Sequence, residues 1–110
     1  MISRDDFEKI DIRAGTIIEV NDFPNAKKPA YRLIIDFGDE IGIKKSSAQI
    51  TVHYKKEDLL NRQVVAVINF PSKQIAVFFS ECLVLGIYDE NKYVILLQPE
   101  RPVKNGMKIG

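Results

Sequence analysis

The sequence predicts an all-β domain: a small closed barrel of five antiparallel strands, with a short helix between the third and fourth strands and short terminal extensions. Three observations support this class. Several short runs alternate apolar and polar residues, which is typical of half-buried strands. Turn residues separate these runs, and only one stretch inside the domain has a helical pattern. A parallel sheet would need a crossover after almost every strand, so the barrel is favoured.

The first half of the chain predicts a strand followed by a hairpin. In residues 12–20 the even positions are apolar or small, and Gly15 in the middle predicts a bulge or sharp bend of the kind that barrel corners need. Alternation returns in residues 31–37 and again in 41–43, which together predict an antiparallel hairpin. Residues 44–49 are polar and depart from the core pattern.

The second half predicts the helix and the remaining strands. Residues 54–60 are helical in pattern, and a further helical turn with a capping serine is expected at 3–7. The β-branched run 64–68 predicts a buried strand, followed by β-like stretches at 75–87 and 93–97. The helix therefore falls where an oligonucleotide/oligosaccharide-binding (OB) barrel has it. An SH3-like barrel or a small sandwich also fits the pattern.

Composition favours one ordinary globular domain over residues 1–110. The chain is 45% hydrophobic and 28% charged, which is enough for one core. Its single cysteine, Cys82, excludes an internal disulfide, and together with the single histidine, His53, it cannot form a structural zinc site. The N-terminus is acidic and no window is apolar enough for a membrane span. We therefore expect a cytoplasmic protein without membrane insertion.

Charge is unevenly spread although the net charge is only +1. Residues 1–24 carry three basic and six acidic groups, whereas residues 25–73 carry nine basic and five acidic groups. Aromatic residues lie among these central lysines and arginines. Such a mixture can hold RNA by phosphate contact and base stacking, or it can simply keep loops soluble.

Catalytic signatures are missing from the sequence. There is no Gly-rich phosphate loop, no paired-cysteine metal motif and no histidine next to a plausible nucleophile. Cys82 stands among apolar residues, which predicts a buried, inert thiol. We therefore expect a binding protein without enzyme activity, cofactor or metal.

Three stretches resemble the tRNA-binding domain family, the OB module attached to methionyl-tRNA synthetases and to EMAP-II-like proteins. Residues 10–15 resemble the family's opening D-[IL]-R-V-G strand, and residues 33–38 its V-D-x-G hairpin. Residues 69–73 and 80–83 resemble its N-L-K-P-x-K-M-R-G … S-E-G-M segment. The resemblance implies an OB barrel and, in free-standing members, a homodimer formed through the terminal extensions.

The departures from that family pattern point to one branch of it. The basic K-P-x-K-M-R-G loop is reduced to residues 71–76, the usual V-S-G-[IL] segment is replaced by residues 44–49, and Cys82-Leu83 replaces Gly-Met. These features resemble the CsaA branch, described as chaperones for exported precursor proteins. The resemblance implies an ATP-independent chaperone that binds unfolded precursors or peptides and passes them to the export motor ATPase.

The weakened basic loop favours this chaperone over a free-standing tRNA-binding protein, and an adaptor docking a partner through a dimer surface is a third reading. Apolar residues 94–97 near the tail suggest the homodimer. In the stretch 75–79, either Phe78 or Phe79 must face away from the core, unless both are core or interface residues. The expected peptide- or RNA-binding residues line one barrel mouth: Arg13, Lys44, Lys45, Ser46, Gln49, Phe70, Lys73, Phe78, Ser80 and Glu81.

Overall fold

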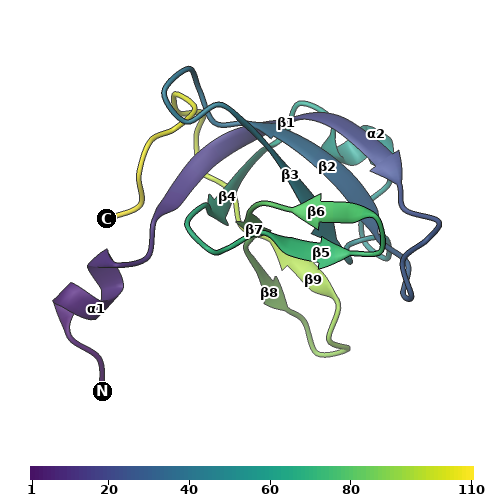
Figure 1. Ribbon diagram of the computed structural model, residues 1–110, viewed down its shortest axis with the longest axis horizontal. Coiled ribbons are helices and arrows are strands. Elements are labelled where there is room, and N and C mark those ends of the chain that lie inside the picture. The colour runs from purple at the N-terminus through teal and green to yellow at the C-terminus, as the bar shows by residue number, and fades with distance from the viewer.

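The computed structural model describes residues 1–110, which form two short helices and nine strands (Figure 1). In chain order these are α1 (Arg4–Glu8), β1 (Ile12–Asp22), β2 (Tyr31–Asp36), β3 (Ile43–Ala48), α2 (Lys56–Leu59), β4 (Gln63–Val67), β5 (Lys73–Ile75), β6 (Phe78–Ser80), β7 (Leu83–Val84), β8 (Gly86–Tyr88) and β9 (Val94–Leu96). Neither helix has the length or the apolar composition that a membrane span requires.

Five strands form the main sheet in the order β3-β2-β1-β4-β7, and every neighbouring pair is antiparallel. The long strand β1 pairs with both β2 and β4, which lets the sheet curl around its own inner face. The register shifts between Ile17 and Glu19, so the bulge lies there and the prediction of a bulge at Gly15 is wrong. Gly15 instead allows the ring of Phe37 to pack closely against the backbone of β1, because a Cβ at this position would lie 2.7 Å from Cδ1 of Phe37.

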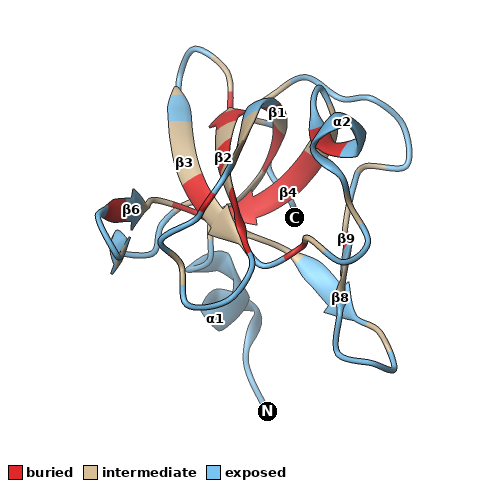
Figure 2. Ribbon diagram, turned by 90° about the vertical axis from the view of Figure 1, so that its right-hand side faces the viewer, coloured by how far each residue is buried: buried red, intermediate tan, exposed pale blue.

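The core fills the inside of this curled sheet (Figure 2). Ile17, Leu33, Ile35 and Val64 have no exposed surface, as expected for alternate residues of paired strands. Helix α2 contributes Leu59, which is also fully buried in the same cluster. The short helix therefore lies between β3 and β4, as the sequence predicts, and packs one side chain into the barrel. The architecture is a nearly closed, five-stranded OB-like barrel.

Two sequence-based expectations about the strands need correction. The polar run 44–49 is mostly strand β3, which pairs with β2 along one edge and forms hydrogen bonds with the segment 80–82 along the other. The stretch 75–87 is not one strand. It contains the end of β5, the strands β6 and β7, and the start of β8, which belong to three separate ladders. The chain turns back at Ala76, whose φ of 55° lies in the left-handed region, and this turn joins β5 to β6.

Three peripheral features surround the barrel. The helical turn α1 forms as predicted, with Ser3 and Asp6 making a reciprocal capping box. Hairpin β8–β9 and hairpin β5–β6 project from opposite sides of the barrel (Figure 2). The C-terminal segment runs back along β1, where Lys108 forms a bridge with Arg13.

Candidate binding surface

A line of hydrogen bonds, here called the seam, joins β3 to residues 80–81 and closes the barrel. The amide of Glu81 donates to the carbonyl of Lys45 at 2.8 Å, and the amide of Lys45 donates back to Oε1 of Glu81 at 2.9 Å. The amide of Ser47 donates to Oγ of Ser80 at 3.1 Å. Side-chain oxygens thus replace the carbonyls that a regular ladder would supply, so Ser80 and Glu81 are committed to the fold.

Ser46 faces the inside of the barrel at the same level. It is 1% exposed and is the one polar residue in the buried set. Its hydroxyl donates to the carbonyl of Cys82 at 3.1 Å. This bond gives the buried hydroxyl the partner that buried polar groups require. Burial raises the pKa of the Cys82 thiol to about 12. The prediction that Cys82 is buried is confirmed, and Ser46 is buried beside it with its hydroxyl bonded inside the barrel.

Outside the seam, two aromatic rings pack against each other, and a cation lies over each ring. The rings of Phe23 and Phe78 meet edge to face, with centroids 5.4 Å apart. The guanidinium of Arg32 lies 5.7 Å from the centroid of Phe23, and Nζ of Lys45 lies 5.4 Å from that of Phe78. With Ala30, the rings form a second buried cluster that fixes the β5–β6 hairpin against the β1–β2 loop.

The exposed aromatic of the β5–β6 hairpin is therefore Phe79, not Phe78. Phe78 is 9% exposed and Phe79 is 48% exposed. The two-residue turn sets this parity, because Ile75 pairs with Phe78 while Gln74 pairs with Phe79 on the other face. Val77, at the tip of the turn, is 81% exposed. The expectation that Phe78 belongs to an accessible surface is corrected by its burial.

Three lysines without ion-pair partners lie on β5 and on strand β3, which neighbours the hairpin. Lys44 and Lys45 lie on β3, and Lys73 begins β5 opposite Ser80. None of the three takes part in an ion pair of the structure. Phe70 precedes β5 and is 55% exposed. We call the β5–β6 surface the set made by these exposed or half-exposed side chains: Lys44, Lys45, Phe70, Lys73, Gln74, Val77 and Phe79.

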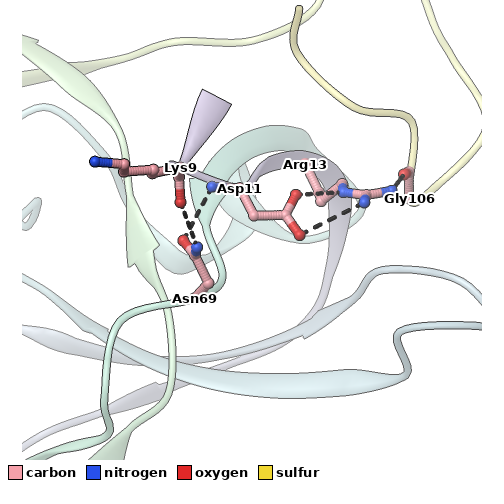
Figure 3. A network of polar contacts seen from close by, with 5 residues as sticks. All are labelled: Lys9, Asp11, Arg13, Asn69 and Gly106. Atoms are coloured by element: carbon pink, nitrogen blue, oxygen red, sulfur yellow. Dashed lines mark hydrogen bonds and ion pairs between the residues drawn. The ribbon is translucent and has the colours of Figure 1, made fainter. Parts of the chain in front are cut away.

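Arg13 belongs to a different network, in which side chains tie the two ends of the chain to the barrel (Figure 3). Its Nε donates to Asp11 at 2.6 Å and its Nη1 donates to the carbonyl of Gly106 at 3.0 Å. The bond to Asp11 raises the pKa of Arg13. The Asn69 side chain accepts from the amide of Asp11 and donates to the carbonyl of Lys9. Arg13 thus links β1 to the C-terminal segment.

The ten sequence-predicted residues consequently divide into three groups. Lys44, Lys45, Phe70 and Lys73 lie at the β5–β6 surface, and Gln49 follows the end of β3. Ser46, Ser80 and Glu81 stand beneath or within the seam, Phe78 is buried with Phe23 outside it, and Arg13 lies against the C-terminal segment. Sequence reasoning missed Gln74 and Val77 and left Phe79 as an alternative to Phe78, because no glycine, asparagine or proline marks the hairpin turn, in which Ala76 takes the left-handed conformation. No group of three acidic, histidine or cysteine side chains is arranged to hold a metal.

Comparison with known proteins assigns the family. Residues 12–108 match the family model "Putative tRNA binding domain". The chain belongs to this tRNA-binding domain family. Two solved members superpose over the whole chain with a TM-score of 0.94. They are the CsaA chaperone protein of Picrophilus torridus, 56% identical with all of its chain covered, and the chaperone CsaA of Bacillus anthracis str. Ames, 51% identical with 99% covered.

Within the family, similarity also extends to a synthetase. The methionine–tRNA ligase of Pyrococcus abyssi (strain GE5 / Orsay) is 43% identical over 105 residues, which are 96% of this chain. The chain spans only 14% of the length of that ligase. The shared unit is thus a small non-catalytic domain type, and the CsaA-like proteins share it over their full length.

Proposed function

We propose that this protein is an ATP-independent chaperone that binds extended segments of unfolded precursor proteins at the β5–β6 surface. One observation carries the proposal: Val77 and Phe79 are exposed on the β5–β6 hairpin, Phe70 is exposed three residues before it, and the lysines of the same surface have no carboxylate partners. Apolar side chains of an unfolded chain can pack on the former, and its acidic groups can contact the latter. The CsaA chaperones, similar over their full length, support this reading.

The setting of this activity follows from the same proposal. Precursors held before export are handed to the export motor ATPase, and this takes place in the cytoplasm. The buried thiol of Cys82 and the absence of any disulfide suit that reducing compartment.

Binding of tRNA is the second candidate function, favoured by the family match and by the central excess of basic groups. Lys27 and Lys28 in the β1–β2 loop are exposed near the hairpin-packing cluster and add to the lysines of the β5–β6 surface. Such a site would neutralise several phosphates, so its affinity must fall steeply with salt, whereas apolar peptide contacts depend on salt far less.

The deciding experiment measures both ligands on the same variants. Wild-type protein is titrated with tRNA and with an unfolded precursor at two salt concentrations, and aggregation of the precursor is followed by light scattering. Reversing Lys44, Lys45 and Lys73 to Glu should abolish tRNA binding and only weaken precursor binding. Reversal of Lys92 and Lys104, which lie outside the surface, is the charge control and should change neither.

The outcomes separate the two functions. Replacing Phe70 and Phe79 by Ser should weaken precursor binding at least several-fold and leave tRNA binding unchanged. Tight tRNA binding at physiological salt without any suppression of precursor aggregation would overturn the chaperone proposal in favour of the tRNA-binding one. If both activities persist in the lysine variant, the surface is misplaced.

A homodimer is part of the proposal. Hairpin β8–β9 exposes Ile87, Tyr88 and Ile95, with exposed fractions of 59%, 73% and 47%. On the terminal extensions, Phe7 and Ile109 line a shallow depression between α1 and the C-terminus. Of the apolar run 94–97, Leu96 is buried in the core and Ile95 faces outward. Sedimentation at micromolar concentration that shows only the 12.5 kDa species would refute the dimer.

A further inference from the structure

Strand β5 is a free sheet edge. It pairs with β6 on one side, and no strand pairs with its other side. Hairpins β5–β6 and β8–β9 stand on opposite sides of the barrel, so the second does not cover the edge of the first (Figure 2). An unpaired edge presents backbone N–H and C=O groups to any extended chain that can approach it.

The turn identifies which backbone groups are free. Ala76 and Val77 form a two-residue turn between Ile75 and Phe78, and the residue pair that flanks such a turn is hydrogen-bonded. Hydrogen-bonded and non-hydrogen-bonded pairs alternate along an antiparallel ladder. The next pair, Gln74 with Phe79, is therefore the non-hydrogen-bonded one. The N–H and C=O of Gln74 consequently point away from β6, and no backbone bond from another segment occupies them.

Side chains next to this edge are unusual for an edge strand. Proteins commonly protect edges by covering them or by surrounding them with charge. Here Phe79, the cross-strand partner of Gln74, is 48% exposed, and Phe70 just before the strand is 55% exposed. The Gln74 side chain does not cover the edge, because its Nε2 is turned to donate to the carbonyl of Ala76 at 3.1 Å.

The charge beside the edge indicates which chain fits it. Lys73 on β5 has no carboxylate partner, and neither has Lys45 across the seam. The carboxylate of Glu81, on the seam, accepts the backbone amide of Lys45 and forms an ion pair with neither lysine. The edge therefore offers backbone groups, apolar surface and uncompensated positive charge, which complement an extended segment with alternating apolar and acidic residues.

We propose that a client polypeptide binds by adding an antiparallel or parallel strand to the free edge of β5, with hydrogen bonds to the N–H and C=O of Gln74. Alternate client side chains then pack on Phe79 and Phe70, and acidic ones contact Lys73. Backbone pairing is indifferent to side-chain identity, so it suits a protein that binds many unfolded sequences. This inference rests on the proposed function, since it specifies how the same surface holds its client.

The test compares two variants that both lack the Gln74 side chain and differ in the backbone donor at this position. Gln74→Pro deletes the N–H that faces solvent, and proline is tolerated at an edge position whose N–H does not join the ladder. Gln74→Ala is the matched control, because it removes the side chain and keeps the N–H. Binding is measured by fluorescence anisotropy of a labelled 12-residue peptide with alternating valine and glutamate. We expect Gln74→Pro to bind about fivefold to tenfold more weakly than Gln74→Ala.

The peptide supplies an independent second measurement. Two versions of the probe carry N-methyl groups, one at two successive valines and the other at two successive glutamates. Because only alternate residues of an added strand direct their N–H to the neighbouring edge, one version should lose affinity and the other should not. Thermal melting shows whether Gln74→Pro is folded, and the methylated peptides test the wild-type protein whatever the variant does.

The outcomes of these two measurements decide whether the client binds by strand addition. Weakening by Gln74→Pro together with unequal effects of the two methylated peptides supports strand addition. If both methylated peptides bind like the parent peptide, strand addition is wrong, even where the proline variant is impaired. In that case the proposed function survives provided that replacing Phe70 and Phe79 by Ser still weakens peptide binding. If the wild-type protein binds tRNA and no peptide, both the inference and the proposed function fail.

Discussion

Glu81 is the residue whose replacement best tests how the barrel closes. Its Oε1 accepts the amide of Lys45 at 2.9 Å, and its own amide donates to the carbonyl of Lys45 at 2.8 Å. Only the first bond depends on the side chain. Glu81→Ala therefore leaves the Lys45 amide, on a half-buried strand, without its charged acceptor.

The size of the effect follows from the kind of bond that is lost. A hydrogen bond to a charged group contributes about 1.5–3 kcal/mol, and a neutral one about 0.5–1.5 kcal/mol. Because the seam is partly open to water, we expect Glu81→Ala to lower the free energy of unfolding by about 1.5–2 kcal/mol. Glu81→Gln keeps an acceptor oxygen at the same place and should cost about half as much.

Urea denaturation at 25 °C measures these differences, with Glu90→Ala as the control. Glu90 is a charged residue of the exposed β8–β9 loop, so its removal should change stability by less than about 0.5 kcal/mol. Hydrogen exchange adds a local readout, because the Lys45 amide should exchange faster in Glu81→Ala and stay protected in Glu81→Gln. Equal stability of Glu81→Ala and Glu90→Ala, with unchanged protection of Lys45, would refute the account of the seam.

Three further predictions concern the core, the thiol and the response to acid. Gly15→Ala should destabilise the fold by about 1–3 kcal/mol, because its Cβ would lie 2.7 Å from the ring of Phe37, and Phe37→Leu should recover part of the loss in a urea titration. Burial raises the pKa of Cys82 to about 12, so iodoacetamide at pH 8 should label it only in denaturant, as mass spectrometry will show. The hydrogen bond from His53 lowers the pKa of Asp89 below its ordinary 3.8, and the backbone amide of Tyr93 lowers it further. The resulting stabilisation is complete above about pH 5, well above the ordinary pKa, and is lost as pH falls through the lowered pKa, so the melting temperatures of wild type and Asp89→Asn should converge between pH 5 and pH 2.5.

Local pattern was enough for most of the architecture. Alternation in 12–20 and 31–37, the β-branched run 64–68 and the short helical stretch 54–60 each correspond to an element of the structure. The reason is that burial of one face imposes a period of two on any strand of a one-layer barrel. The polar strand β3 escaped the same reasoning, because only one of its edges pairs with the neighbouring strand β2, and the groups that bond to its other edge and to Ser46 lie more than thirty residues further along the chain.

The candidate site was predicted less completely, and the physical cause is the same in each instance. Residue type identified lysines, aromatics and polar groups near the hairpin. It could not show which of these side chains are already buried or hydrogen-bonded within the fold. Arg13 is taken by Asp11 and Gly106, and Ser46 by the carbonyl of Cys82. A guanidinium or hydroxyl that is satisfied internally has the same letter in the sequence as one that is free.

The sequence by itself determined the class of fold, the single inert thiol and the gathering of positive charge in the middle of the chain. These depend on periodicity and composition, which are local or additive properties. The tertiary structure alone decided that Phe79 rather than Phe78 faces outward, that Glu81 closes the barrel and that β5 keeps a free edge. Each of these depends on which distant segment occupies a given hydrogen bond or covers a given ring, and no short stretch of sequence contains that information.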